Sequence, residues 1–379
     1  MGMINTVAIL GFLAMLAVYF PISSFLRNRK VVVEQSGASI RSKNRKNAGK
    51  SRTKNKTEVV SLANPQDRSI GLTIFVAVMV VAFLLRVIIG GVYHGHEQDM
   101  SCFIAWADMV YNDGFHKFYE TMTEGYPPGY IYILYVIGWL RHLFSIPWDS
   151  ATSDILTKMP SILTDMGMGY LIYKVASEKF RETGAALLAA VYLFCPAILL
   201  DSVVWGQTDS IYVVFIAWMF YLIAKKKLIP SYFLFALAIL LKPQAMMFAP
   251  VLIYGIIDHV FLQDFNWKKF GINLGMGLTA ILCMVISVLP YGLQKVISLY
   301  TNTVGSFEYA SVNAYNFWTL CGKNWISQGE TKFGLTYQTW GTIFILLIII
   351  ATVFISFRCK KTEAKYSYIG AVLIIGIFM

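Results

Sequence analysis

Charged side chains are scarce in this sequence, and their scarcity excludes an ordinary soluble domain. Only 14% of the 379 residues are charged and 57% are hydrophobic, whereas about 25% of the residues of a soluble domain carry charge. Several apolar runs approach the roughly 20 residues with which a helix crosses about 30 Å of hydrocarbon. None of them alternates in the manner of a membrane β-barrel. The sequence therefore predicts an all-α, polytopic transmembrane helix bundle.

Paired cysteines are missing as well. The five cysteines lie far apart, without a CxxC pair and without a histidine at the spacing of a zinc site. They therefore predict neither a disulfide framework nor a zinc motif. One bridge, between Cys102 and Cys321, stays open because both cysteines fall in segments that we expect on the outer side.

Acidic residues are fewer than basic ones, but the excess of Lys and Arg is confined to one stretch of the chain. The net charge is +11, and residues 27–68 alone hold twelve Lys and Arg against three acidic residues, which gives +9. Since the remainder is nearly neutral, the charge does not indicate a nucleic-acid partner. A Ser-, Asn- and Lys-rich stretch of this kind is typical of a disordered cytoplasmic linker that touches anionic membrane lipids.

The charge pattern divides the chain into three sections. Residues 1–26 are predicted to be an N-terminal membrane anchor, because basic residues follow the apolar run rather than precede it, the reverse of a signal peptide. Residues 27–69 form the linker, and residues 70–379 form the transmembrane domain. The last apolar segment, 366–379, would reach about 21 Å at 1.5 Å per residue, too short to span. We therefore expect the chain to be part of a longer protein.

The basic clusters predict the direction of each apolar segment. From a cytoplasmic linker the segment 70–92 runs outward and places Asp99 outside, whereas Lys225 to Lys227 should be cytoplasmic. An odd number of crossings must lie between them, so one of the four intervening segments does not span. The weakest is 126–144, which we expect in the interface or re-entering on the outer side. The expected segments are 70–92, 126–144, 158–176, 184–203, 211–224, 229–258 folded near Lys242-Pro243, 270–290, 339–357 and 366 onward.

The first candidate for chemistry is the segment His94-Gly-His96-Glu97-Gln98-Asp99, directly beyond a membrane helix. A carboxylate at the headgroup level can take a proton from an acceptor hydroxyl while a lipid-linked substrate stays in the bilayer. The amphipathic stretch that follows should lie along the interface. Two alternatives stay open, a polar turn without a function and a divalent metal site of His96, Glu97 and Asp99, although their spacing is crowded for one metal.

Two further polar clusters lie between apolar runs. Asp201-Ser-Val-Val-Trp205-Gly206-Gln207-Thr208-Asp209-Ser210 holds two carboxylates at the membrane edge, where charge is expensive and usually functional. Helix capping by Asp209 is the alternative. Lys242-Pro243-Gln244 places an ammonium at the fold of an apolar hairpin, where it suits a phosphate. Snorkelling of the lysine to the interface is the alternative.

Amides and aromatic rings alternate in the outer loop before the 339–357 segment. Asn313, Asn316 and Trp318 form a surface that can stack on a sugar ring or a polyprenyl chain and bond to hydroxyls. An interfacial aromatic belt is the alternative. Asp165, inside the 158–176 segment, is a further buried carboxylate that we expect to be functional.

These motifs together resemble the polytopic GT-C glycosyltransferases, most of all the bacterial relatives of the GPI-anchor mannosyltransferases. The resemblance covers roughly residues 70–357 and rests on the order of its motifs. They are an Asp after the first core helix, Phe-x-x-Trp-Ala, Tyr-Pro-Pro-Gly-Tyr, Trp-Gly-Gln-Thr-Asp-Ser, Lys-Pro-Gln and Asn-Ala-Tyr-Asn-Phe-Trp.

The resemblance implies a bacterial plasma-membrane enzyme of the cell envelope. It would transfer a hexose, such as mannose, from a polyprenyl-phosphate donor to a lipid, glycan or protein acceptor on the outer face, with inversion. Asp99 would be the general base and Glu97 a second catalytic acidic residue, two positions early for the family, which leaves metal dependence open.

The resemblance also implies which residues bind the substrates. Gln207 and Asp209 would lie around donor or acceptor, and Lys242 would meet the donor phosphate. The expected substrate-binding residues are His96, Asp165, Trp205, Gln207, Asp209, Lys242, Gln244, Asn313, Asn316 and Trp318. A flippase or transporter of lipid-linked sugars is the alternative function, although no inverted repeat is visible. A non-enzymatic scaffold would not need carboxylates at four membrane-edge positions.

Overall fold

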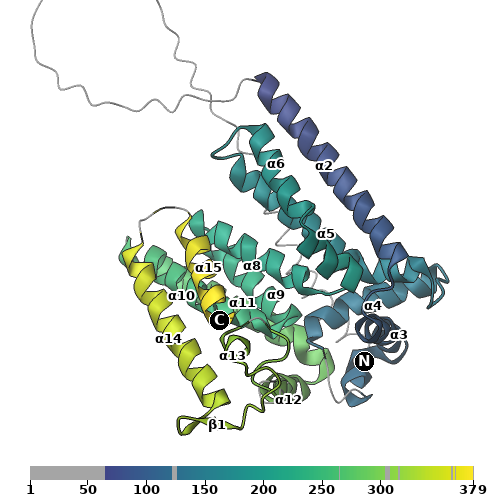
Figure 1. The fold of residues 1–379 in the computed structure, drawn as a ribbon. Coiled ribbons are helices and arrows are strands. Elements are labelled where there is room, and N and C mark those ends of the chain that lie inside the picture. The colour runs from purple at the N-terminus through teal and green to yellow at the C-terminus, as the bar shows by residue number, and fades with distance from the viewer. Residues whose placement is uncertain are drawn as a thin grey trace, which may run out of the picture.

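The computed structural model describes residues 65–121, 126–263, 265–303, 308–314, 316–359, 362 and 364–378. The predicted anchor and nearly all of the predicted linker lie outside these residues. Within them the chain is a bundle of helices with a single two-stranded hairpin (Figure 1). The prediction of an all-α polytopic bundle is confirmed.

The first half of the bundle follows the predicted segments closely. Its elements are α2 (Pro65–Val92), α3 (Glu97–Thr121), α4 (Pro128–Leu143), α5 (Ala151–Ala176), α6 (Glu182–Leu193), α7 (Pro196–Leu199), the π-helix η1 (Leu200–Trp205) and α8 (Asp209–Ala224). α5 begins earlier than the apolar run predicted, because the Ser150 side chain accepts a hydrogen bond from the Ser153 N–H and starts the helix there.

The second half contains the predicted hairpin near Lys242. Its elements are α9 (Leu228–Leu241), η2 (Pro243–Phe248), α10 (Ala249–Ile256), η3 (Ile257–Leu262), α11 (Trp267–Val288), η4 (Leu289–Tyr291), α12 (Leu293–Thr303), α13 (Phe317–Leu320), β1 (Thr331–Lys332), β2 (Leu335–Thr336), α14 (Tyr337–Arg358) and α15 (Lys365–Phe378). Cys102 and Cys321 are both free thiols, so the bridge left open between them is wrong.

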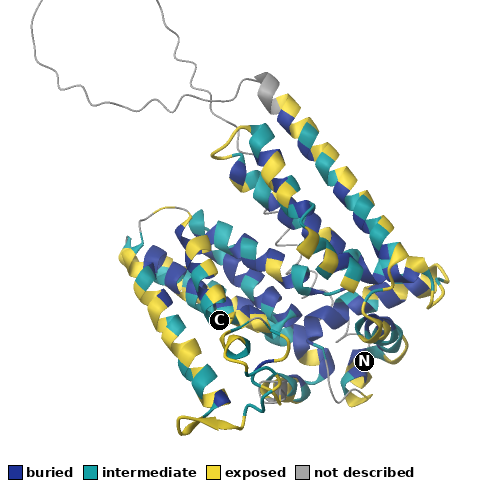
Figure 2. Ribbon diagram, viewed as in Figure 1, coloured by how far each residue is buried: buried dark blue, intermediate teal, exposed yellow. Residues whose placement is uncertain are grey.

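Four helices of the described residues are long and apolar enough to cross a membrane, and a bent pair adds a fifth. The four are Ser69–Val92, Pro243–Leu262, Trp267–Tyr291 and Tyr337–Arg358, and the pair is Glu182–Leu193 with Pro196–Trp205, bent by 47°. The outward sides of α2 and α14 are exposed although they are apolar, while α8 and α9 are buried between other helices (Figure 2). Exposed apolar helix faces of this extent fit lipid contact rather than water.

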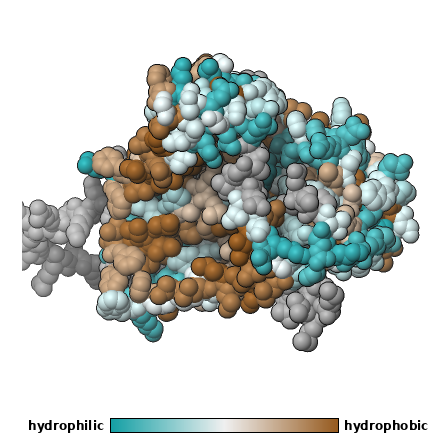
Figure 3. Space-filling model, turned by 90° about the horizontal axis from the view of Figure 1, so that it is seen from below, coloured by the Kyte–Doolittle hydropathy of each residue, from teal (hydrophilic) through white to brown (hydrophobic). Residues whose placement is uncertain are grey.

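The bundle has two chemically different ends. One end, which we name the basic end, holds the Lys225 turn, where Lys225 Nζ lies 2.6 Å from Glu178, and the start of α15, where Lys365 Nζ lies 2.6 Å from Asp258. At the opposite end, the site end, lie Asp99 after α2 and Lys242 after α9. Seen from below, hydrophobic side chains gather on the left and in the centre of the surface, and hydrophilic ones gather on the right and at the top (Figure 3).

The helices α3 and α4 pack on each other at the site end. Arg141 of α4 donates to Asp108 of α3 over 2.7 Å. A side chain at Gly129 would meet the Leu240 backbone at 2.6 Å, and one at Gly138 would clash with the Ala107 carbonyl. These contacts place α4 beside α3 and beside the last turn of α9. This position fits the expectation that the 126–144 segment does not cross from one end of the bundle to the other.

Candidate functional site

Two of the predicted site residues lie where η1 ends: Trp205 is its last residue, and Gln207 lies in the tight turn that follows. The Asp201 carbonyl accepts hydrogen bonds from the N–H groups of Gly206 and Gln207, and Gly206 adopts a φ of 92°, which favours glycine. A side chain at Gly206 would also meet Met100 Sδ at 2.6 Å. The π-helical widening, which is frequent at functional sites, therefore turns both side chains toward the start of α3.

Asp99 is the point on which these side chains converge. Its Oδ2 accepts a hydrogen bond from Trp205 Nε1 over 3.0 Å and another from Gln207 Nε2 over 2.8 Å. Oδ1 has no partner among the described residues. The carboxylate is about one-third exposed, so its orientation is fixed on one oxygen while the other can accept a proton from a ligand.

His96 packs beside Asp99 and Trp205. Its ring stacks on Trp205 with centroids 5.0 Å apart, and its Nδ1 lies 3.4 Å from Asp99 Oδ2. Its backbone N–H also donates to the Trp205 carbonyl over 2.7 Å. Glu97 is exposed and makes no side-chain contact with this group among the described residues. The structure thus brings His96, but not Glu97, against the carboxylate.

Lys242 and Asp209 form the second part of the site. Lys242 Nζ lies 2.5 Å from Asp209 Oδ1, in the gap between the end of α9 and the start of α8. An ammonium has three N–H donors, so the pair leaves Lys242 able to donate to a further anion. The lysine is mostly buried and the carboxylate is more exposed, which does not fit a side chain that only snorkels.

Tyr126 connects the two parts, and sequence reasoning missed it as a site residue. Its hydroxyl lies 2.5 Å from the Thr208 hydroxyl, between Gln207 and Asp209 in the chain. Burial raises the pKa of Tyr126 above its ordinary value, although Lys242 acts in the opposite direction. The phenol therefore keeps its proton at neutral pH and can donate a hydrogen bond. The Tyr-Pro-Pro-Gly-Tyr segment was the available signal.

Asp165 lies behind the site rather than on its surface. It is completely buried, Arg86 Nε donates to its Oδ2 over 3.0 Å, and the Ser202 hydroxyl donates to the same oxygen over 2.8 Å. Ser202 belongs to η1, the element that carries Trp205. Arg86, inside α2, was not anticipated. The ion pair thus links α2 and α5 to the turn that carries the site residues.

The remaining predicted residues are not in contact with Asp99 in the described part of the chain. Gln244 is exposed beside Lys242. Asn313 bonds to Asn324 and Trp325 within its own loop. The Asn316 side chain caps α13 by accepting from Thr319, and Trp318 packs against Tyr337 and Phe344. These residues organise the loop between α12 and α14.

A metal site is not formed by the acidic and histidine residues of the described segments. No three His, Cys, Asp or Glu side chains among the described residues converge as a metal would require. At Asp99, two N–H donors and the His96 ring occupy the surroundings of Oδ2. The geometry there suits a proton acceptor held by hydrogen bonds.

Comparison with known families supports a sugar transferase. Residues 135–291 match the model of the family described as dolichyl-phosphate-mannose-protein mannosyltransferase. This segment runs from α4 to η4 and contains the turn of Trp205 and the Lys242–Asp209 pair, while Asp99 lies before it. No curated protein matches the chain. The match confirms the resemblance to GT-C enzymes for this segment and indicates a membrane glycosyltransferase.

Proposed function

We propose that this chain, whose residues 135–291 match the dolichyl-phosphate-mannose-protein mannosyltransferase family, transfers a hexose from a polyprenyl-phosphate donor to an acceptor hydroxyl. The acceptor belongs to a lipid, a glycan or a protein on the outer face of the membrane. The observation that carries the proposal is that a proton acceptor, Asp99, and a cation, Lys242, are bound by two residues of one turn, Gln207 and Asp209. The Cα atoms of their partners Gln207 and Asp209 are at most about 7.6 Å apart, twice the Cα spacing.

In the proposed reaction Asp99 is the general base. The acceptor oxygen attacks the anomeric carbon while its proton passes to Asp99 Oδ1. The bond between the anomeric carbon and the phosphate oxygen breaks, and polyprenyl phosphate leaves with the electron pair. A single displacement of this kind inverts the anomeric centre. Trp205 and Gln207 support the proposal because they hold the base from its other oxygen.

Lys242 is the proposed partner of the donor phosphate. Its ammonium stabilises the charge that grows on the leaving phosphate, and Asp209 keeps it in place when no donor is bound. The Tyr126 hydroxyl, bonded to Thr208, is a further donor on the same side. The exposed indole of Trp205 and the ring of His96 offer a face on which a sugar can stack.

The test is transfer with purified chain in liposomes. Polyprenyl-phosphate mannose, glucose and galactose, each radiolabelled in the sugar, are supplied with membrane extracts as the acceptor source. We expect labelled product from at least one donor with the parent and roughly 10²-fold less of it with Asp99→Asn. Movement of labelled donor across the bilayer without transfer would support a flippase and overturn the proposal.

A further inference from the structure

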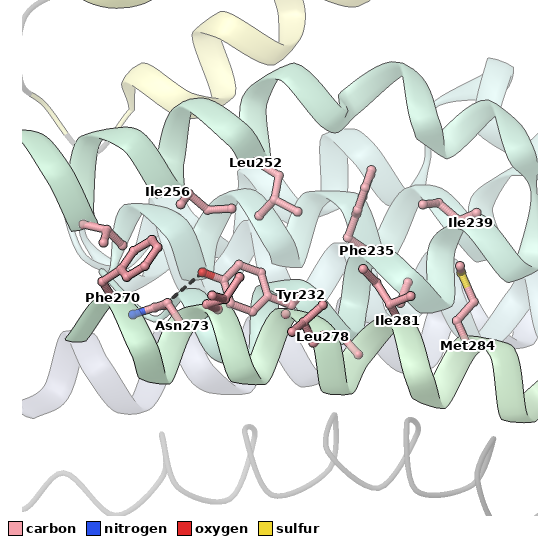
Figure 4. Close-up of a pocket in the computed structure, with 15 residues that line it drawn as sticks. Tyr232, Phe235, Ile239, Leu252, Ile256, Phe270, Asn273, Leu278, Ile281 and Met284 are labelled. Carbon is pink, nitrogen blue, oxygen red and sulfur yellow. Dashed lines mark hydrogen bonds between the residues drawn. The ribbon is translucent and has the colours of Figure 1, made fainter. Parts of the chain in front are cut away.

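A narrow apolar groove runs along α11 on the outside of the bundle. Its volume is about 470 Å³, and its walls come from α9, α10, η3 and α11 (Figure 4). Phe235 and Ile239 of α9 face Leu278 and Ile281 of α11 across it. Gly277, in the middle of α11, lines the groove, and a Cβ there would meet no atom within 4 Å, so the space beside it is open.

A polar hollow continues the groove at the first turns of α11. Its volume is about 390 Å³, and Asn266, Lys268, Lys269, Ile272 and Asn273 line it. Asn273 lines both cavities, and its Oδ1 accepts a hydrogen bond from Tyr232 over 2.9 Å. The two cavities thus adjoin at Asn273, and we name the apolar one the slot and the polar one the mouth.

The mouth carries positive charge. Lys269 Nζ donates to the His259 carbonyl, whereas Lys268 is exposed and its Nζ has no partner among the described residues. No acidic residue of the described segments lines either cavity. The charge of the mouth is complementary to an anion.

Aromatic residues place the mouth at the level of lipid headgroups. Trp267, the first residue of α11, is 76% exposed, and Phe265 and Phe261 beside it are exposed as well. Exposed aromatic side chains next to lysines are typical of the border between hydrocarbon and headgroups. The slot then runs from this border into the hydrocarbon.

The opposite end of the slot argues against the sugar donor as the ligand. Ile239, Ile281 and Met284 line this end of the slot, and none of them offers a charged group to a phosphate. We propose that the groove of α11 binds one anionic phospholipid, with its phosphate at Lys268 in the mouth and one acyl chain in the slot. The mouth lies at the basic end, while the slot reaches Ile239, three residues before Lys242; phospholipid binding at the mouth does not depend on the proposed reaction.

Native mass spectrometry of the full chain, titrated in detergent with phosphatidylglycerol or phosphatidylcholine, tests the headgroup. We expect the parent to bind phosphatidylglycerol more tightly, and Lys268→Gln to weaken that binding by about fivefold, the effect of one lysine near a membrane surface. Lys226→Gln, in another exposed basic turn, should leave it unchanged. Equal binding of both lipids by the parent overturns the proposal.

Two substitutions in the same helix test the slot. Gly277→Leu places a side chain in the slot, and Gly275→Leu adds the same side chain outside it; neither Cβ would meet an atom within 4 Å. We expect Gly277→Leu to lower the occupancy of both lipids and Gly275→Leu to retain it. Parental occupancy in Gly277→Leu overturns the proposal. So does a preference for polyprenyl phosphate over phosphatidylglycerol, which would identify the slot as part of the donor site.

Discussion

Asp99 derives its proposed role from an asymmetric set of contacts at the scale of a single residue. Two N–H donors bind Oδ2, and the described residues leave Oδ1 to the substrate. A carboxylate without such partners could rotate and would present either oxygen. Hydrogen bonds that fix a catalytic group before the substrate arrives lower the cost of reaching the reactive geometry.

The first prediction concerns this carboxylate. Asp99→Asn retains the size of the side chain but removes proton acceptance, so single-turnover transfer should fall by roughly 10²-fold or more. Donor affinity, measured in parallel, should stay near the parental value. Glu97→Gln is the matched control, because Glu97 is exposed and lies in the same turn. A near-parental rate for Asp99→Asn would place the base elsewhere.

The second prediction concerns Lys242. Lys242→Met removes the cation that pairs with Asp209 and with the donor phosphate. The KM for the donor should therefore rise by about tenfold or more, which corresponds to the free energy of a hydrogen bond to a charged group. Lys242→Arg retains the charge and should lose less. Steady-state kinetics over a range of donor concentrations measure both variants. Equal KM for Lys242→Met and the parent would show that the lysine does not meet the phosphate.

At the scale of the element, η1 is held in place by a buried ion pair. Arg86 and Asp165 are completely buried, and the Ser202 hydroxyl bonds to the same carboxylate oxygen that Arg86 approaches. The pair lies between α2 and α5, and η1 packs against both. A change in the pair should therefore shift Trp205, the last residue of η1, and Gln207 in the turn that follows.

The third prediction concerns that pair. Arg86→Met leaves Asp165 buried without its partner and should destabilise the fold by about 3–5 kcal/mol. The double variant Arg86→Met with Asp165→Leu removes both charges and should recover most of the loss. Thermal unfolding in detergent, followed by tryptophan fluorescence, compares the variants with Ser202→Ala, which should cost about 1 kcal/mol. Equal stability of the single and double variants would contradict an ion pair of this strength.

At the scale of the whole molecule, the separation of basic and site ends supports the proposed orientation. Lys225, Lys269 and Lys365 lie at one end, and Asp99 and Lys242 lie at the other. The positive-inside rule predicts a cytoplasmic basic end, and with that orientation the proposed site would face outward. The aromatic and amide loop around Asn313 lies between α12 and α14.

The fourth prediction tests this orientation with single cysteines in a cysteine-free chain. A cysteine at position 313 should react with a membrane-impermeant maleimide added to intact cells, whereas one at position 226 should react only after permeabilisation. Position 97, exposed beside Asp99, is a second outside position, and position 179 is a second inside one. Labelling at 226 with protection at 313 would reverse the orientation.

The sequence alone determined the fold class, the positions of most apolar helices and the polar segments between them. It could do so because apolar runs of membrane length and clusters of lysine are local features. The hairpin at Lys242-Pro243 falls where a proline follows the end of the preceding helix at Leu241, whereas the bend between Leu193 and Pro196 in the 184–203 segment was not predicted. The predicted features need no knowledge of which helices touch.

Only the tertiary structure decided how the polar residues combine. Asp99 meets Trp205 and Gln207 across 106 and 108 positions of sequence, and no local pattern encodes such a meeting. Arg86 was overlooked because a single charge in the apolar run of α2 does not reveal which neighbour it faces. Asp165, expected among the substrate-binding residues, proved to be its partner. The groove of α11 likewise depends on how α9 and α10 pack beside Gly277. Contacts between distant segments follow from packing, and packing is a property of the folded chain.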